Sequence, residues 1–124
     1  MTEQEIFDAV VAHLLKQKAR AMAPAFEGDM MCAYHGSDGK ACAIGCLIPA
    51  NEYKDWFEGL SVDEIYKSVS TIKDARPLFL EELQRLHDNH EVNTWPEMLV
   101  KFAKHWKIQW EHLPQLKNLP NGVA

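Results

Sequence analysis

Apolar side chains recur every three or four residues in five stretches of the chain, the pattern typical of helices with one buried face. The expected helices begin near Glu3, Pro49, Val62, Pro77 and Trp95. Three of them follow a capping box, in which a Ser or Thr is followed three residues later by a Glu: Thr2, Ser61 and Thr94. Pro24 predicts that the first helix ends between residues 21 and 23.

The spacing also predicts which side chains each helix buries. Acidic residues lead the first helix and basic residues trail it, as the helix dipole favours. The expected buried residues are Ile6, Phe7, Val10, Val11 and Leu14, then Tyr53, Trp56, Phe57 and Leu60, then Val62, Ile65, Val69 and Ile72, then Leu80, Leu83 and His87, and finally Leu99, Phe102, Ala103 and Trp106.

Residues 30–49 carry the strand-like pattern of the chain. Two apolar runs flank a Gly-Ser-Asp-Gly turn at residues 36–39. The second run, residues 40–48, alternates between two faces, and neither face is polar. The small Ala43 and Gly45 would allow a helix to approach closely. We therefore expect a β-hairpin covered on both sides.

Together these elements predict an α+β fold, a mostly α-helical single domain of about five helices packed around one β-hairpin. A chain of 124 residues has the size of one domain. Residues 1–108 would form the compact domain. Beyond residue 108 the periodicity decays, so residues 109–124 are expected to form an irregular C-terminal tail.

Composition and charge indicate which classes of partner and which cellular compartment to expect. The net charge of −5, with both signs interspersed, disfavours a general nucleic-acid binder, which needs a basic face. The N-terminal residues resemble no secretory signal, and no apolar run approaches the roughly 18 residues that span a membrane. Three cysteines, an odd number, favour free thiols in a reducing compartment. We expect a cytoplasmic protein.

The cysteines raise the question of a zinc site, because Cys32, His35, Cys42 and Cys46 are four soft ligands close in sequence. If residues 42–46 form a strand, Cys42 and Cys46 lie about 13 Å apart. Thiolates that share one zinc ion lie within about 4 Å of each other. The geometry therefore favours cysteines that fill the core as small hydrophobic residues, with no metal and no cofactor.

A thiol enzyme is the second possibility, with Cys32, Cys42 or Cys46 paired with His87. Asp88 is adjacent, but neighbouring helix residues diverge by about 100°, so we expect it not to orient His87. No hydrolase, metalloprotease or deaminase motif is present. A small metal- or thiol-dependent enzyme thus stays an alternative, and no residue is predicted to be catalytic.

Two further patterns have ordinary explanations. Residues 36–40 contain glycine and lysine but lack the Gly-Lys-Ser/Thr of a phosphate-binding loop, so they predict a turn. In residues 101–110, aromatic and basic side chains interleave, which fits an amphipathic helix with solvated lysines. A nucleic-acid-binding module that uses this helix remains a further alternative.

Several short motifs of the sequence resemble those of a family of small uncharacterised proteins of tailed phages and prophages. The strongest is Cys-x-Tyr-x-Gly at residues 32–36 followed by Cys-Ala-Ile-Gly-Cys-Leu-Ile-Pro at residues 42–49. Weaker matches extend the resemblance over residues 6–108. The chain departs from the family at His35, where arginine is frequent, and at the additional Ala41. The resemblance implies a cytoplasmic phage accessory protein, and no activity comes with it.

The function predicted from the sequence is therefore non-enzymatic binding of a host protein, as a modulator or inhibitor of host machinery or defence. The turn of the predicted hairpin and the aromatic tail are the expected contact surfaces, because exposed apolar clusters mark interaction sites. The predicted partner-binding residues are Tyr34, His35, Ser37, Asp38, Lys40, Trp110, Leu113 and Leu116.

Overall fold

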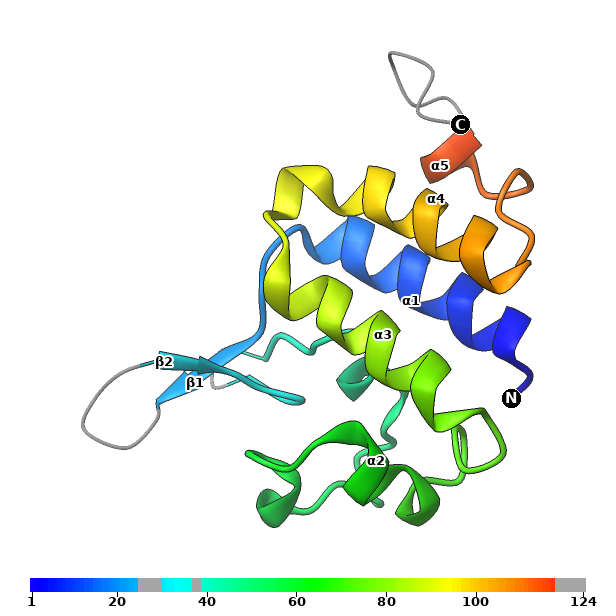
Figure 1. Ribbon diagram of the computed structural model, residues 1–124. Helices are drawn as coiled ribbons and strands as arrows, with labels where there is room; N and C mark the ends of the chain where they lie inside the picture. Colours follow the sequence, from blue (N-terminus) through cyan, green and yellow to red (C-terminus); the bar gives the residue numbers. More distant parts are fainter. Residues whose placement is uncertain (25–29, 37–38, 118–124) are drawn as a thin grey trace.

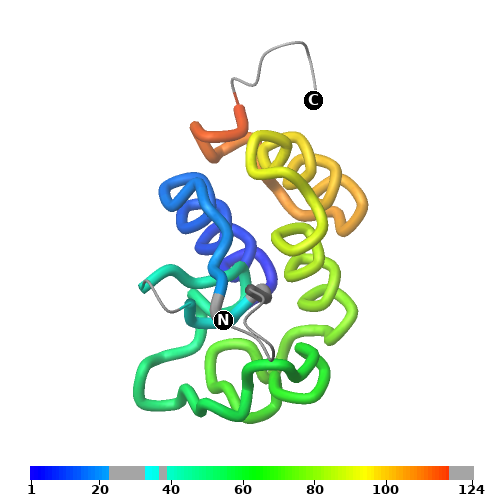
Figure 2. Tube along the Cα trace, turned by 90° about the vertical axis from the view of Figure 1, so that its left-hand side faces the viewer, coloured from blue at the N-terminus to red at the C-terminus, as the bar shows by residue number. Residues whose placement is uncertain are grey.

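Three helices form the main body of the protein in the computed structural model, which describes residues 1–24, 30–36 and 39–117. They are α1 (Glu3–Gln17), α3 (Pro77–Asn89) and α4 (Trp95–Trp106), and they lie side by side (Figure 1). Residues 33–36 and 39–75 form a second part with little regular structure, which packs against α1 and α3. Figure 2 shows the same division from the side.

Helix α1 follows the sequence prediction in its start and its buried face. The Glu5 carboxylate accepts a hydrogen bond from the Thr2 N–H (2.8 Å), and Thr2 Oγ1 accepts one from the Glu5 N–H (3.1 Å). All five predicted apolar residues of α1 are buried. The helix ends earlier than Pro24 predicted, because Lys18 adopts a left-handed conformation (φ 54°) and its N–H caps the Leu14 carbonyl.

The three main helices meet at an aromatic cluster. Phe102 of α4 stacks on Phe7 of α1, with 5.9 Å between the ring centroids, and contacts Phe79 of α3 edge-on at 5.1 Å. At the edge of this cluster, the Arg76 guanidinium pairs with the Glu3 carboxylate at 2.6 Å. This pair fixes the beginning of α3 against the beginning of α1.

The predictions for α3 and α4 are largely confirmed. Pro77 occupies the first turn of α3, and the predicted face of Leu80, Leu83 and His87 is buried. The capping box predicted at Thr94 is wrong, because a 3₁₀ turn at Val92–Thr94 precedes α4. The Thr94 hydroxyl donates to the Glu91 carbonyl (2.7 Å) and does not cap the helix.

The predicted α+β class and its β-hairpin are wrong, because the protein is all-α. In the described residues, regular β-structure is limited to two three-residue strands, β1 (Met22–Pro24) and β2 (Met30–Cys32). They pair antiparallel, with Met22 opposite Cys32, and lie before the predicted turn. The predicted pair of strands is reduced to one isolated bridge between His35 and Ala41.

Residues 42–48 form helical turns in place of the predicted strand. A 3₁₀ helix spans Gly45–Leu47, and the Cys46 N–H donates to the Cys42 carbonyl (3.1 Å). The segment lies in the core, with Cys42, Ala43, Ile44, Leu47 and Ile48 all buried. A segment that is apolar on every side carries no periodicity that separates a strand from a helical turn.

Residues 49–75 contain shorter helices than the sequence predicts. Helix α2 covers only Val62–Ile65 and is followed by 3₁₀ turns at Tyr66–Ser68, although Val69 and Ile72 are buried as expected. The Glu64 carboxylate accepts a hydrogen bond from the Ser61 N–H (3.1 Å), which is one of the two reciprocal hydrogen bonds of the predicted capping box.

The stretch after Pro49 forms a 3₁₀ helix at Asp55–Phe57, where a buried Trp56 was expected. Phe57 is buried, but Trp56 is 60% exposed, so that part of the prediction is wrong. A single 3₁₀ turn places neighbouring side chains on different sides, and Phe57 takes the inner one.

At the other end of the chain, residues 109–117 contain the short helix α5 (Pro114–Lys117), which packs on α1 and α4.

Gly45 is required by close packing. A methyl group at this position would overlap the Tyr34 carbonyl and lie 2.8 Å from Tyr34 Cα, so two backbone segments cross here without room for a side chain. We expect Gly45→Ala to lower the free energy of unfolding by about 2–4 kcal/mol. Urea denaturation measures the change.

Gly59→Ala is the matched control, since Gly59 has open space around it and only a positive φ of 83°. That substitution should cost about 1 kcal/mol, the strain of a left-handed alanine. Equal losses for the two variants would contradict the packing explanation for Gly45.

Candidate functional site

The described cysteines differ in burial, since Cys42 is buried and Cys46 half-buried, and both thiols have raised pKa values. Cys42 is fully buried, and burial raises the pKa of its thiol far above the ordinary range, against the smaller opposing effect of the Gly45 N–H. Burial also raises the pKa of Cys46 to about 12, and this thiol donates to the Ala43 carbonyl (3.1 Å). Cys32 belongs to β2, and its side chain lies outside the described part of the structure.

The geometric argument against zinc does not hold, because it assumed that residues 42–46 form a strand. The helical turn brings the backbones of Cys42 and Cys46 within one hydrogen bond of each other. Across residues 1–24, 30–36 and 39–117, however, no three His, Cys, Asp or Glu side chains are grouped so that they could hold a metal ion.

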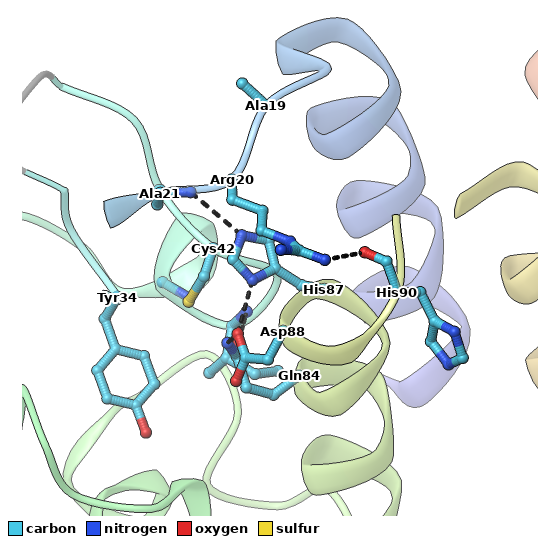
Figure 3. A network of polar contacts seen from close by, with 12 residues as sticks. Ala19, Arg20, Ala21, Tyr34, Cys42, Gln84, His87, Asp88 and His90 are labelled. Carbon is cyan, nitrogen blue, oxygen red and sulfur yellow. Dashed lines mark hydrogen bonds and ion pairs between the residues drawn. The ribbon is translucent and has the colours of Figure 1, made fainter. Parts of the chain in front are cut away.

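His87 lies fully buried in a chain of hydrogen bonds on α3 (Figure 3). Its Nε2 accepts from the Ala21 N–H (3.2 Å), so the ring proton is on Nδ1, which donates to Asp88 (2.7 Å). The expectation that Asp88 cannot orient His87 is therefore wrong. Gln84 extends the chain, since its amide donates to Asp88 (2.9 Å) and accepts from the Ile44 N–H (3.0 Å).

This arrangement differs from a catalytic dyad. Both nitrogens of His87 have partners, and one ring face lies against Trp95, with 5.4 Å between the centroids. A general base needs a free nitrogen within reach of a substrate. His87 instead joins α3 to the segment that follows α1.

The Glu58 carboxylate connects two loops. It accepts hydrogen bonds from the Tyr34 N–H (2.9 Å), the His35 N–H (3.1 Å) and the Tyr53 hydroxyl (2.5 Å). Burial, with the Glu58 hydrogen bond as a further cause, raises the pKa of Tyr53 above its ordinary value. The Tyr34 hydroxyl donates to the Leu60 carbonyl (2.6 Å), which ties the same two loops together again.

A row of aromatic side chains runs from these hydrogen bonds to the surface. His35 stacks on Tyr53 (4.2 Å between centroids), Tyr53 contacts the edge of Phe57 (6.1 Å), and Phe57 contacts Trp56 (4.7 Å). We call these four residues the aromatic row. Its outer end is the exposed Trp56, which sequence reasoning had placed in the core; the single-turn spacing of residues 55–57 gave no signal of its exposure.

Beside the row lies a cleft of about 340 Å³, lined by His13, His35, Lys40 and Cys46 together with glycine backbone. His13 Nε2 donates to the Ala41 carbonyl (2.7 Å) and His35 Nε2 to the Gly45 carbonyl (3.0 Å). Because carbonyls only accept, Nε2 is the donor in both contacts.

The predicted partner-binding residues fall into two separate places. Tyr34 is buried, His35 and Lys40 are half-buried near the aromatic row, and Ser37 and Asp38 lie outside the described residues. In the tail, Trp110 and Leu113 are half-buried, and Leu116 is buried against the body. Residues 109–117 lie apart from residues 45–60 in both views (Figures 1 and 2).

Comparison with known proteins adds no relative: no family model, curated protein or solved structure matches the chain. Among the helices of the described residues, none has the length and apolar character needed to cross a bilayer.

The thiol geometry predicts slow alkylation. At pH 8 a thiol of pKa 12 is almost wholly protonated, so Cys46 should react with iodoacetamide about a thousandfold more slowly than a free cysteine of pKa near 8.5. Buried Cys42 should be protected as well. Peptide mass spectrometry of native and urea-unfolded protein gives the rate at each site, and rapid native labelling of either residue would revive the thiol-enzyme alternative.

The Glu58 carboxylate should matter for stability. Glu58→Ala leaves the N–H groups of Tyr34 and His35 without their acceptor in a partly buried place, and we expect a loss of about 2–4 kcal/mol in the free energy of unfolding. Glu52→Ala is the control, because Glu52 accepts from the exposed Ser70 N–H, which water can satisfy. The control should lose under about 1 kcal/mol. A similar loss in both variants would rule out this role of Glu58.

Proposed function

We propose that the protein acts by binding a protein of a bacterial host, as a phage-type accessory protein that modulates or inhibits host machinery or defence. The phage origin comes from the sequence resemblance over residues 6–108. The binding role rests on the surface at the outer end of the aromatic row. The observation that carries it is the 60% exposure of Trp56 on a well-supported loop.

An exposed tryptophan is the residue type that most often dominates binding energy at protein interfaces. Trp56 has its own support, because Phe57 lies edge-on beneath it and Tyr53 holds Phe57 in turn. Lys54 and Asp55 next to it are exposed and supply charged groups of both signs around the apolar centre. An apolar anchor with a polar rim is the usual anatomy of a protein interface.

The alternatives have less support. For a thiol enzyme, the described thiols are protonated by burial and His87 has no free nitrogen. For a nucleic-acid module on residues 101–110, an aromatic face is needed for base stacking. Trp106 packs on Phe79 at 5.5 Å and donates to Glu82, which leaves little of its ring for a base.

The proposal predicts that one side chain controls the interaction. In pull-downs from host lysate with tagged full-length protein, a specific partner should be recovered with the wild type and lost with Trp56→Ala. Calorimetry with the purified partner should show binding weaker by at least about thirtyfold, the effect of an interface hot spot.

Leu78→Ala is the matched control, because Leu78 is also a large apolar side chain, 52% exposed. It should change the affinity less than about threefold. Both variants should keep the unfolding midpoint of the wild type. Equal recovery of the partner by Trp56→Ala, or hydrolase activity without any partner, would contradict the proposal.

A further inference from the structure

A groove between α3 and α4 is a second surface feature, separate from the aromatic row. The two helices are antiparallel, because Phe79 in the first turn of α3 contacts Trp106 at the end of α4, with 5.5 Å between the ring centroids. At the other end, His87 in the last turn of α3 stacks on Trp95, where α4 begins. The groove runs along both helices and has a volume of about 320 Å³.

Helix α4 lines the groove with one of its faces. The lining residues are Met98 and the residues three, four and seven positions after it, which are Lys101, Phe102 and His105. This spacing corresponds to one side of a helix, and it spans about 10 Å along the axis. The groove therefore has the length of two helical turns, which suits a short helical segment that lies alongside α3 and α4.

The floor of the groove is apolar but small. Met98 is half-buried, and Leu86 and Phe102 have only 5% and 8% of their surface exposed. The floor thus offers contact for a few apolar side chains, and the charged groups at the edges decide what the groove can bind.

The edges of the groove are mainly basic. Arg85 of α3 and Lys101 of α4 are exposed, and within the described residues no salt bridge holds either side chain. His90 and His105 add an imidazole on each side. The carboxylate that the described lining contains, that of Glu82, already accepts a hydrogen bond from a neighbouring indole (2.7 Å). The local charge is thus opposite to the net charge of the chain, which is −5.

We infer that this groove binds a short acidic, amphipathic helix of a partner protein. Carboxylates of that helix pair with Arg85 and Lys101, and its apolar side chains pack on Met98. A helix that lies in an apolar groove is a recurring mode of peptide recognition, and complementary charge selects the partner. This surface is independent of the one at Trp56, so either proposal can fail without the other.

The test uses a fluorescein-labelled peptide, Glu-Leu-Ala-Glu repeated three times, whose fluorescence anisotropy is measured on titration with the full-length protein at low salt. The matched probe has Lys in place of every Glu and should bind at least about tenfold more weakly, because it meets like charges at the groove. The net charge of −5 alone would favour the basic peptide instead. Binding of the basic peptide as tight as that of the acidic one would therefore overturn the inference, as would tighter binding of a short DNA duplex.

Charge reversal on α4 gives a second measurement. Lys101→Glu should weaken binding of the acidic peptide about fivefold at low salt, the size of effect expected when an exposed attractive pair becomes repulsive. Lys104→Glu is the control, because Lys104 is also exposed on α4 but does not line the groove. It should change the affinity less than about twofold. Equal losses in the two variants would show that the overall charge controls binding, which would contradict a specific role of the groove.

Discussion

The irregular half of this protein depends on side chains that satisfy buried backbone groups. Residues 33–36 and 39–60 have little helix or sheet to pair their N–H and C=O groups, and each unpaired buried group costs about 1–3 kcal/mol. Polar side chains take the place of a neighbouring strand: Gln17 accepts from Ala41, Gln84 from Ile44, His87 from Ala21, and Glu58 from both Tyr34 and His35. Three of these four acceptor residues, Gln17, Gln84 and His87, belong to the main helices. Their hydrogen bonds therefore hold the irregular part of the chain in place against α1 and α3.

This constraint also changes how the reactive residues are understood. A buried His beside an Asp, near a cysteine, resembles a catalytic group when only the residue types are known. In the structure, the same His87 and Asp88 are engaged by Ala21 and Gln84, and Cys42 is a buried, protonated core residue. The groups with potential chemistry stabilise the fold, whereas the aromatic side chain at residue 56 is exposed and makes no such contribution to the core.

The sequence predicted the long helices well because their burial is one-sided. The apolar face of α1 and its cap at Thr2 follow from periodicity and local hydrogen bonding alone. Residues 42–48 could not be predicted in the same way, since an apolar segment buried on all sides has no period. The hydrogen bond between Asp88 and His87 did not follow from the sequence. The 100° between neighbouring helix positions describes only the backbone, and rotation of the two side chains still lets them meet. The exposure of Trp56 depends on a single 3₁₀ turn, which leaves no repeat in the sequence.

Glu58 has a consequence for the binding surface that we propose. One carboxylate accepts from the backbone at residues 34–35 and from Tyr53, so three hydrogen bonds join the two loops that carry the aromatic row. A surface that is already ordered before a partner arrives loses little conformational entropy on association. In the interface that we propose, preorganisation of this kind would let a small contact area, centred on one indole ring, yield useful affinity in a chain of only 124 residues.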